Sequence, residues 1–389
     1  MSTQHPFALL KVERELTEEQ RAIQAVTRQF VNERIKPNIA EWFESGELPA
    51  RDLAKELGSI GLLGMHLQGY GCAGTDATSY GLANMELEAG DSGIRSLVSV
   101  QGSLAMFAIY AYGSEEQKQE WLPRMAKGEA IGCFGLSEAD HGSNPSGMLT
   151  HAKRDGDDWI INGNKMWITN GTLADVAVIW TQTEEGMRGF AVPTTTPGFK
   201  ANLIKHKLSL RASAPAELVF TDMRVPDSMR LPLATSLRAP LMCLAEARYG
   251  IIFGTVGAAR DCFETALAYA STREQFDGPI SRHQLTQGKL ASMATDLTTA
   301  YLLALHIGKL KDAHEVTPEH ISMGKFNNAN TALEIARTAR SILGGAGITT
   351  EYSVFRHMVN LETVLTYEGT HEIHQLVIGQ ALTGIASFR

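Results

Sequence analysis

Apolar residues recur at helical spacing through the first third of the chain. A capping box at residues 17–20 (Thr-Glu-Glu-Gln) marks a helix start, and Ile23, Val26 and Phe30 follow at the spacing of a buried stripe. Pro37 interrupts this helix, because a proline lacks the N–H group that a helix interior needs. The pattern predicts further helices over residues 51–63, 79–88, 96–112 and 115–127. The first third is therefore predicted to be all-α.

The pattern changes near residue 130. Short runs rich in β-branched and aromatic residues then alternate with turn residues, at positions 150–154, 159–161, 165–168, 176–182, 189–193 and 217–220. Asp155-Gly156 and Asn162-Gly163 are typical of hairpin turns. After Pro232, helical periodicity returns over residues 247–272, 283–312, 318–343 and 371–388. We therefore expect an α-helical domain over residues 1–129, a β domain over 130–232 and a second α-helical domain over 233–389.

Composition limits the classes of function. Of the 389 residues, 44% are hydrophobic and 20% are charged, which is typical of a globular chain with a sizeable core. The net charge of −8 and the scattered basic residues argue against nucleic-acid binding. The four cysteines lie far apart without histidines at ligand spacing, so we expect reduced thiols and no metal site. No apolar run reaches about 18 residues and the N-terminus lacks a targeting signal, so we expect a cytoplasmic chain without a membrane span.

Near the C-terminus, Glu368 lies beside a glycine at the junction between an apolar stretch and the last predicted helix. A carboxylate at such a junction can be partly desolvated, which raises its pKa until it can act as a base. The alternative is an ordinary helix start, with Thr370 as the N-cap and Glu368 in solvent. The segment by itself leaves both interpretations open.

Three other segments have the composition of a ligand site. Residues 133–144 begin as a strand and end as a loop of hydroxyl groups, glycine and acids, which suits a polar, flat or phosphorylated ligand. Trp167 and Thr169 lie at a strand end, where an indole could cover an aromatic ring system. Gly344 and Gly345 indicate a helix cap or a close approach to a ligand, but no strand precedes them as in a dinucleotide fingerprint. The alternatives for the three segments are, in the same order, a plain turn, a core tryptophan and a simple helix cap.

Arg95 lies between two apolar helices. An arginine in an apolar bundle needs an anionic partner, either an internal acid such as Glu88 or a bound carboxylate. Ser96 adds a neighbouring donor. Gly90 and Gly93 predict a break between the helices, so Glu88 and Arg95 need not face each other.

These motifs occur together in the order of one known family. The loop at residues 133–143, the Trp167-Ile168-Thr169 strand, the segment 273–276, the Gly344-Gly345 turn and the segment 367–370 resemble the acyl-CoA dehydrogenases over nearly the full chain. Residues 92–96, 110–117, 208–214 and 366–373 are most similar to the glutaryl-CoA dehydrogenases of that family.

The resemblance implies a mainly α fold with a central β domain: an α domain, a β-barrel or sandwich domain and a four-helix-bundle domain. It implies FAD as the cofactor, an acyl-CoA substrate, an electron-transferring flavoprotein as the electron acceptor, and a homotetramer. Glu368 would be the catalytic base, since Ala247 occupies the position that some relatives use instead and cannot accept a proton. The backbone N–H of Glu368 and a ribityl hydroxyl would polarise the thioester carbonyl.

The resemblance also assigns binding residues. The flavin would be flanked by Leu136, Ser137, Trp167, Ile168 and Thr169. The nucleotide half of FAD would be bound across a subunit interface by Arg273, Phe276 and Gln284, with Gly344, Gly345 and Thr370 completing the site. The substrate would contact Glu88, Arg95, Ser96, Ser143, Ala247, Arg248 and Gly369. The chain departs from many relatives at Ile94, Asp277 and Ala346.

Three hypotheses follow. In the first, Glu368 removes the α-proton of glutaryl-CoA, Arg95 binds its far carboxylate, and loss of carbon dioxide after oxidation yields crotonyl-CoA. In the second, the substrate is a neutral short or branched acyl-CoA and Arg95 is only paired to Glu88. In the third, the chain is a flavin-depleted relative that binds acyl-CoA or assists assembly. The third is disfavoured because Glu368 and every flavin-facing motif are present.

Overall fold

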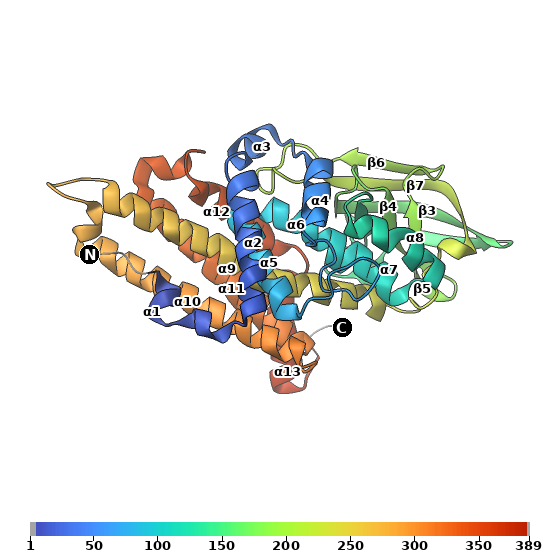
Figure 1. Ribbon diagram of the computed structural model, residues 1–389. Helices are drawn as coiled ribbons and strands as arrows, with labels where there is room; N and C mark the ends of the chain where they lie inside the picture. The colour runs from blue at the N-terminus through green and yellow to red at the C-terminus, as the bar shows by residue number, and fades with distance from the viewer. Residues whose placement is uncertain (1–4, 387–389) are drawn as a thin grey trace.

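The computed structural model describes residues 5–386, and the elements follow the order helices, strands, helices (Figure 1). The N-terminal helices are α1 (Pro6–Leu9), α2 (Glu18–Phe30), α3 (Ile39–Ser45), α4 (Ala50–Ser59), α5 (Ala77–Gly90), α6 (Ser92–Ser99), α7 (Phe107–Tyr112) and α8 (Glu115–Ala126). A π-helical stretch, Val100–Met106, joins α6 to α7 without a break. The first third is all-α, as its periodicity predicts.

The first long helix confirms its predicted start but not its predicted buried stripe. Thr17 and Gln20 form both hydrogen bonds of the capping box. Val26 is exposed, whereas Thr27 is fully buried and donates to the carbonyl of Ile23. The helical spacing in the sequence fits two neighbouring faces of the helix. In the fold, the face that contains Thr27 packs against the core.

The β domain is one seven-stranded sheet with the order β1-β4-β2-β3-β7-β6, in which β5 also pairs with β4. Its strands are β1 (Gly132–Gly135), β2 (His151–Asp155), β3 (Asp158–Thr169), β4 (Val176–Thr183), β5 (Gly186–Pro193), β6 (Phe199–Leu203) and β7 (Pro215–Pro226). The Asp155-Gly156 hairpin is confirmed, since Asp155 pairs with Asp158. The predicted turn at Asn162-Gly163 is wrong, because β3 continues through it with a shift in register at Gly163, where φ is +138°.

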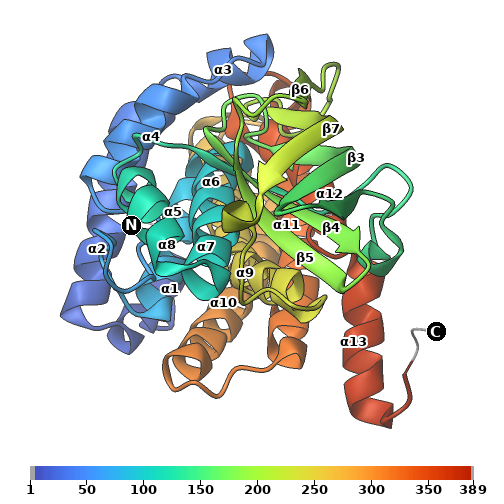
Figure 2. The same cartoon turned by 90° about the vertical axis from the view of Figure 1, so that its right-hand side faces the viewer.

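The C-terminal helices are α9 (Arg238–Thr272), α10 (Gln284–Asp312), α11 (Pro318–Leu343), α12 (Ser353–Thr366) and α13 (His371–Thr383). The sequence analysis did not predict α12 or β6. The predicted last helix ended at residue 388, which lies outside the described residues, and α13 ends at Thr383. In Figure 2, α13 projects from the body of the molecule.

The N-terminal and C-terminal helices share one hydrophobic core, to which α5 of the first group and α9 of the second both contribute. These two helices approach so closely at Gly257 of α9 that a methyl group there would overlap the carbonyl of Met85. A methyl group at Gly254 would likewise overlap the carboxylate of Glu88. The close contact brings Glu88 and the residues of α9 to one buried site.

Three helical stretches are long and apolar enough to cross a membrane by length and composition only: Ser92–Tyr112, α9 and α10. The prediction that no segment could span a membrane tested only for unbroken apolar runs, and it missed them. The fold buries 83% and 72% of the most apolar windows of the first two, so the protein core accounts for their composition. For α10 the buried share is 44%, and its large exposed apolar side chains are Leu285 and Leu302.

Candidate active site

Glu368 lies in the short turn between α12 and α13, where the backbone adopts an unusual conformation. Its φ angle is +53°, and Gly369 follows with +94°. The left-handed region costs a non-glycine residue about 1 to 2 kcal/mol, so surrounding contacts must hold Glu368 there. Thr370 then caps α13 by accepting from the N–H of Ile373.

One partly buried and one fully buried cation provide those contacts. Arg248 of α9 donates from Nε to the carbonyl of Glu368 at 2.6 Å. Lys325 of α11 donates from Nζ to the carbonyls of Tyr367 and Gly369, at 2.7 and 2.6 Å. The family resemblance assigned Arg248 to the substrate pocket, but no motif identified Lys325, which lies among other polar residues of α11.

The carboxyl group of Glu368 is poorly solvated. The residue is only partly exposed, and its Oε2 is buried without a hydrogen-bond partner among the described residues. Burial raises the pKa of Glu368, and the positive charges of Arg95, Lys325 and Arg248 oppose this rise without cancelling it. The alternative of a solvated glutamate outside a capped helix is therefore wrong for Glu368, although Thr370 is the N-cap.

Arg95 and Glu88 face each other across the break between α5 and α6, contrary to the expectation that they need not. Arg95 Nε donates to Glu88 at 2.8 Å, and both side chains are fully buried. The break lies at Asp91, whose extended backbone lets α6 fold back beside α5. Ser92 also donates to Glu88, at 2.9 Å.

The ion pair does not use all the donors of Arg95. Its NH1 group is buried without a partner in the described chain, and so is the hydroxyl of Ser96. The NH2 group of Arg95 donates to the hydroxyl of Tyr367, the residue before Glu368. Unsatisfied buried donors are costly, so this arrangement fits a ligand carboxylate near the turn that contains Glu368.

The predicted flavin segments lie side by side at one end of the sheet. Leu136 and Ser137 follow β1, and Ser137 accepts a hydrogen bond at 2.8 Å from the backbone of Met166 in β3. Trp167 is 60% exposed with φ of +63°, so the alternative of a core tryptophan is wrong. Ile168 points into the sheet core, whereas Thr169 at the end of β3 is partly exposed.

A buried lysine that the sequence analysis overlooked joins these segments. Lys165 donates from Nζ to the carbonyl of Leu136 at 3.0 Å and to Glu138 at 2.9 Å. Burial lowers the pKa of Lys165 to about 8, against the opposing effect of Glu138. Burial would raise the pKa of Glu138, but donors from Thr150, Leu149 and Lys165 lower it to about 2.

Two predicted substrate contacts differ in their surroundings. Ser143 lies in the exposed loop after Leu136 and is open to a ligand. Ala247 is completely buried in a hydrophobic cluster, one residue before Arg248. A methyl group at Gly369 would lie 3.1 Å from Arg248 and from the buried His374, so the backbone of this turn is tightly enclosed.

The predicted nucleotide-binding residues lie elsewhere. Arg273 and Phe276 occupy the exposed loop between α9 and α10, at the end of the molecule opposite the sheet (Figure 1). Phe276 is 87% exposed and its φ is +53°. Gln284 begins α10 and, with Leu285 and Lys289, lines a groove of about 630 Å³ against α11. Lys289 donates to Ser341 at 3.0 Å, which joins this groove to the end of α11, next to Gly344 and Gly345.

Thr370 does not join that group within one chain. It caps α13 near Lys325, and the helical rise places Lys325 about 28 Å along α11 from Gly344. The expectation that Thr370, Gly344 and Gly345 complete one site is therefore not met by a single copy of the chain.

Family models of the acyl-CoA dehydrogenase N-terminal, middle and C-terminal domains match residues 17–129, 133–223 and 237–383. The chain belongs to the acyl-CoA dehydrogenase family. The resemblance inferred from the motifs is thereby confirmed, as is the fold of two helical domains around a β domain. The β domain is an open half-barrel sheet.

Relatives of known structure cover the whole fold. Two structures of a glutaryl-CoA dehydrogenase from Mycobacterium smegmatis, one in complex with FADH2, are 64% identical, with a TM-score of 0.98 over 100% of both chains. The butyryl-CoA dehydrogenase of Megasphaera elsdenii is 30% identical, with a TM-score of 0.90 over 94% of this chain and 98% of that one. The human short-chain specific acyl-CoA dehydrogenase is 35% identical over 94% of this chain and 90% of its own length.

Proposed function

We propose that this chain oxidises glutaryl-CoA between Cα and Cβ with FAD as cofactor and decarboxylates the product to crotonyl-CoA. The family membership supports the oxidation of an acyl-CoA thioester, and the 64% identity to a glutaryl-CoA dehydrogenase supports the acyl chain. The observation that carries the choice of substrate is the pair of unsatisfied buried donors at Arg95 and Ser96.

The residues at the sheet end fit a flavin. The exposed indole of Trp167 offers an aromatic face, with the partly exposed Thr169 and Ser137 nearby, whereas Leu136 is buried behind them. FAD, when bound, would accept the β-hydrogen of the substrate as a hydride. Lys165 would keep the two flavin segments together through Leu136 and Glu138.

Glu368 would remove the α-proton. Its carboxyl oxygen has no competing partner, and its raised pKa brings it closer to the pKa of an acidified α-carbon. Its own backbone N–H would donate to the thioester oxygen, where negative charge develops. Arg248 and Lys325 would keep this N–H and the carboxylate in a fixed relation by holding the adjacent carbonyls.

Arg95 would bind the far carboxylate of the substrate through NH1, with Ser96 as a second donor. After oxidation, the bond between Cγ and this carboxylate breaks, carbon dioxide leaves, and the electron pair stays on the acyl chain. Addition of one proton then yields crotonyl-CoA, and the protonated Glu368 is positioned to supply it.

A second candidate is the oxidation of a neutral short acyl-CoA without decarboxylation. The 2.8 Å ion pair between Arg95 and Glu88 favours it, because Glu88 already neutralises the arginine. This alternative does not explain the unsatisfied donors of Arg95 and Ser96. For that reason we prefer the dicarboxylate.

We also propose a homotetramer in which each FAD is shared between chains, with electrons leaving to an electron-transferring flavoprotein. Arg273, Phe276, Gln284, Gly344 and Gly345 would bind the nucleotide half of an FAD whose flavin lies in a neighbouring copy. Such an assembly would cover the side chain of Leu285, which is 86% exposed on α10, and the projecting helix α13 (Figure 2).

One experiment tests the proposed reaction. The purified protein is examined for the yellow colour of bound flavin and incubated with glutaryl-CoA, butyryl-CoA, isobutyryl-CoA and an artificial electron acceptor, and the products are identified by mass. We expect crotonyl-CoA and carbon dioxide from glutaryl-CoA at the highest kcat/KM. Preferred oxidation of butyryl-CoA would establish the second candidate, and a colourless protein without turnover would contradict both.

A second experiment tests the shared cofactor. Arg273→Ala should weaken FAD retention, since loss of a charge-assisted contact to the pyrophosphate costs about 2 to 3 kcal/mol, and dilution should aggravate the loss. Arg21→Ala, an exposed arginine of α2, is the control. An unchanged ratio of flavin to protein after dialysis of the Arg273 variant would refute this role.

A further inference from the structure

Lys325 is a buried cation that neither transfers a proton nor binds the substrate in the proposed reaction. It lies on α11, and its ammonium group contacts the turn that contains the catalytic glutamate. We propose that Lys325 is a positioning residue, which fixes the backbone of Glu368 by bridging the carbonyls on both sides of it. The proposal rests on the proposed function only for the role of Glu368 as the base.

The bridge spans the catalytic residue. Nζ of Lys325 lies 2.7 Å from the carbonyl oxygen of Tyr367 and 2.6 Å from that of Gly369. The carbonyl between them, that of Glu368, accepts from Arg248 at 2.6 Å. Three successive carbonyls are therefore held by two cations from two different helices, and each peptide group around Glu368 has a set direction.

Such a bridge is needed because the turn is not held by regular secondary structure. Glu368 and Gly369 both have positive φ, between the last residue of α12 and the start of α13. Rotation of either peptide group would turn the carboxylate and the N–H of Glu368 away from a common target. A displacement of about 1 Å at a reacting group can reduce turnover by about a hundredfold.

The contacts of Lys325 distinguish a backbone role from an ion pair. Among residues 5–386, its hydrogen bonds go to carbonyl oxygens, and no carboxylate forms a salt bridge with it. Its ammonium also lies 5.9 Å from the ring centre of Tyr367. The charge of Lys325 therefore acts on the carboxylate of Glu368 only from a distance, whereas its donors act directly on the turn.

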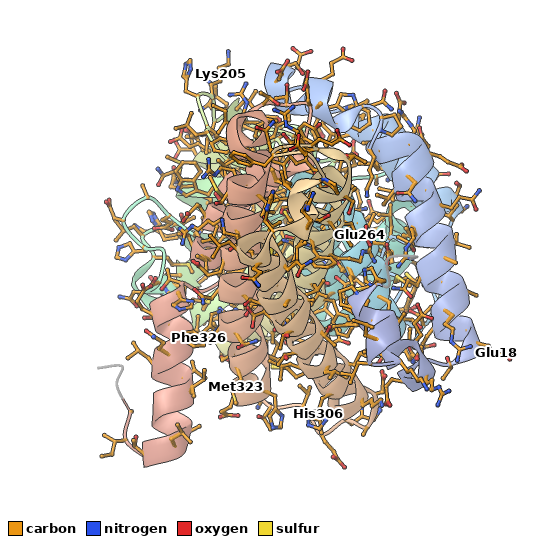
Figure 3. The ribbon with its side chains drawn as sticks, turned by 90° about the vertical axis from the view of Figure 1, so that its left-hand side faces the viewer. Glu18, Lys205, Glu264, His306, Met323 and Phe326 are labelled. Carbon is orange, nitrogen blue, oxygen red and sulfur yellow. The ribbon has the colours of Figure 1, made fainter. Side chains whose placement is uncertain are left out.

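The same face of α11 holds the beginning of α13. Ser322, three residues before Lys325, lies 3.1 Å from Nδ1 of the buried His374. Phe326, the next residue after Lys325, stacks on His371 with ring centres 4.1 Å apart, and Figure 3 shows it beside α13. Three contacts from one segment of α11 thus locate the catalytic turn and the helix that follows it.

The test compares Lys325→Met, which keeps the length and removes the donors and the charge, with Lys325→Arg, which keeps donors and charge. Lys207→Met is the matched control, because Lys207 also bridges two backbone carbonyls, those of Leu210 and Ser213, at 2.6 and 2.9 Å. Amide hydrogen exchange of the peptide over residues 366–370 is measured in each FAD-loaded variant, together with kcat and KM.

For Lys325→Met, we expect exchange in this peptide to accelerate about tenfold or more and kcat to fall about a hundredfold, with KM changed by less than about threefold. Lys325→Arg should recover part of both losses. Lys207→Met should accelerate exchange only around residues 207–213 and leave kcat within about threefold of the parent. Unchanged exchange in the catalytic turn of a folded Lys325→Met would overturn the proposal, as would a kcat within about threefold of the parent.

The pH profile supplies a readout that a purely structural residue would not move. The groups facing Glu368 are Arg95 of α6, Glu88 of α5, Arg248 of α9, Lys325 of α11 and the buried His374 of α13. Lys325→Met removes one of the three cations that lower the pKa of Glu368, so the acid limb of kcat/KM should shift to higher pH. Lys325→Arg keeps the positive charge, so its acid limb should stay at the parent position. An acid limb at the parent position in Lys325→Met would contradict this.

Two further features keep the test decisive. If Lys325→Met does not fold, Lys325→Gln, which keeps one neutral donor group, is subject to the same expectations and the same contradicting outcomes. Turnover is measured with whichever acyl-CoA the parent protein oxidises fastest. Failure with glutaryl-CoA would therefore overturn the proposed substrate and leave the test of Lys325 intact, since hydrogen exchange needs no substrate.

Discussion

Two glutamates, Glu86 of α5 and Glu368 in the turn between α12 and α13, lie in low-dielectric surroundings among positive charges but differ in how they are paired. Glu86 accepts hydrogen bonds from Gln24, Arg28 and Arg260, and both of its oxygens are used. Burial would raise the pKa of Glu86, but the charge and hydrogen bonds of Arg260, together with those of Arg28, lower it to about 2. This carboxylate is ionised at neutral pH, and both of its oxygens accept hydrogen bonds.

The cations near Glu368 donate their hydrogen bonds to groups other than its carboxylate. Arg248 and Lys325 donate to backbone carbonyls of the turn, and Arg95 is occupied by Glu88 and Tyr367. Its Oε2 is left without a partner, and burial raises its pKa. A buried carboxylate keeps a raised pKa and can act as a base when the neighbouring donors point away from it. It has a lowered pKa and stabilises the fold when those donors bind it directly.

The largest expected effect comes from removing the unpaired carboxylate. Glu368→Gln keeps the shape of the side chain and removes the base, so turnover should fall by at least about a thousandfold while FAD and thioester binding persist. Stopped-flow reduction of the flavin measures the loss. Glu372→Gln, an exposed glutamate of α13, is the control and should keep the parent rate. Retention of more than about a tenth of the rate in the Glu368 variant would refute its assignment as the base.

The paired glutamate should respond in the opposite way. Glu86→Gln leaves the buried Arg260 without its main counter-charge and should lower the free energy of unfolding by about 3 to 5 kcal/mol, while kcat stays close to the parent value. Denaturant unfolding measures this. Glu56→Gln removes a half-exposed partner of Arg34 and should cost less than about 1 kcal/mol. Equal losses in the two variants would contradict the comparison.

The arginine that faces Glu368 sharpens the comparison through substrate choice. Arg95→Met removes the donor for the far carboxylate, so kcat/KM for glutaryl-CoA should fall about 30-fold or more while butyryl-CoA is spared or improved. The change also leaves Glu88 unpaired, so the double variant Arg95→Met, Glu88→Gln serves as the control without the stranded charge. Equal losses on both substrates in the double variant would assign Arg95 a structural role.

The mildest perturbation is a change of pH on the unmodified protein. The pKa of Glu86 is lowered, so its stabilising contribution is present above the unfolded value near 4.5 and is lost as the pH falls towards about 2. The pKa of Glu368 is raised above 4.5, so the base is protonated first. On acidification, kcat/KM should therefore decline reversibly before the far-ultraviolet circular dichroism changes. Simultaneous loss of activity and structure would show that the two glutamates are not separated in this way.

The sequence predicted the large elements well where periodicity was long. The start of α2 was correct because a capping box is a local interaction, and α11 was correct at both ends because Pro318 and Gly344 mark them. The Asn162-Gly163 turn was wrong because the same dipeptide also suits a bulge, and the partner strand β7 decides between the two. The helix α12 was not predicted, because its apolar residues were treated as one continuous apolar run and their helical periodicity was not considered.

By itself, the sequence determined the family and the order of the three domains, and it predicted Glu368 as the base, because these depend on local patterns and on motifs at fixed positions. Only the tertiary structure decided what surrounds that residue. Arg248 lies 120 residues before the carbonyl that it holds, and Lys325 lies 42 and 44 residues before its two carbonyls. Contacts at such separations are set by the packing of α9 and α11 against the turn, and no local pattern encodes whether a donor meets a carboxylate or the backbone beside it.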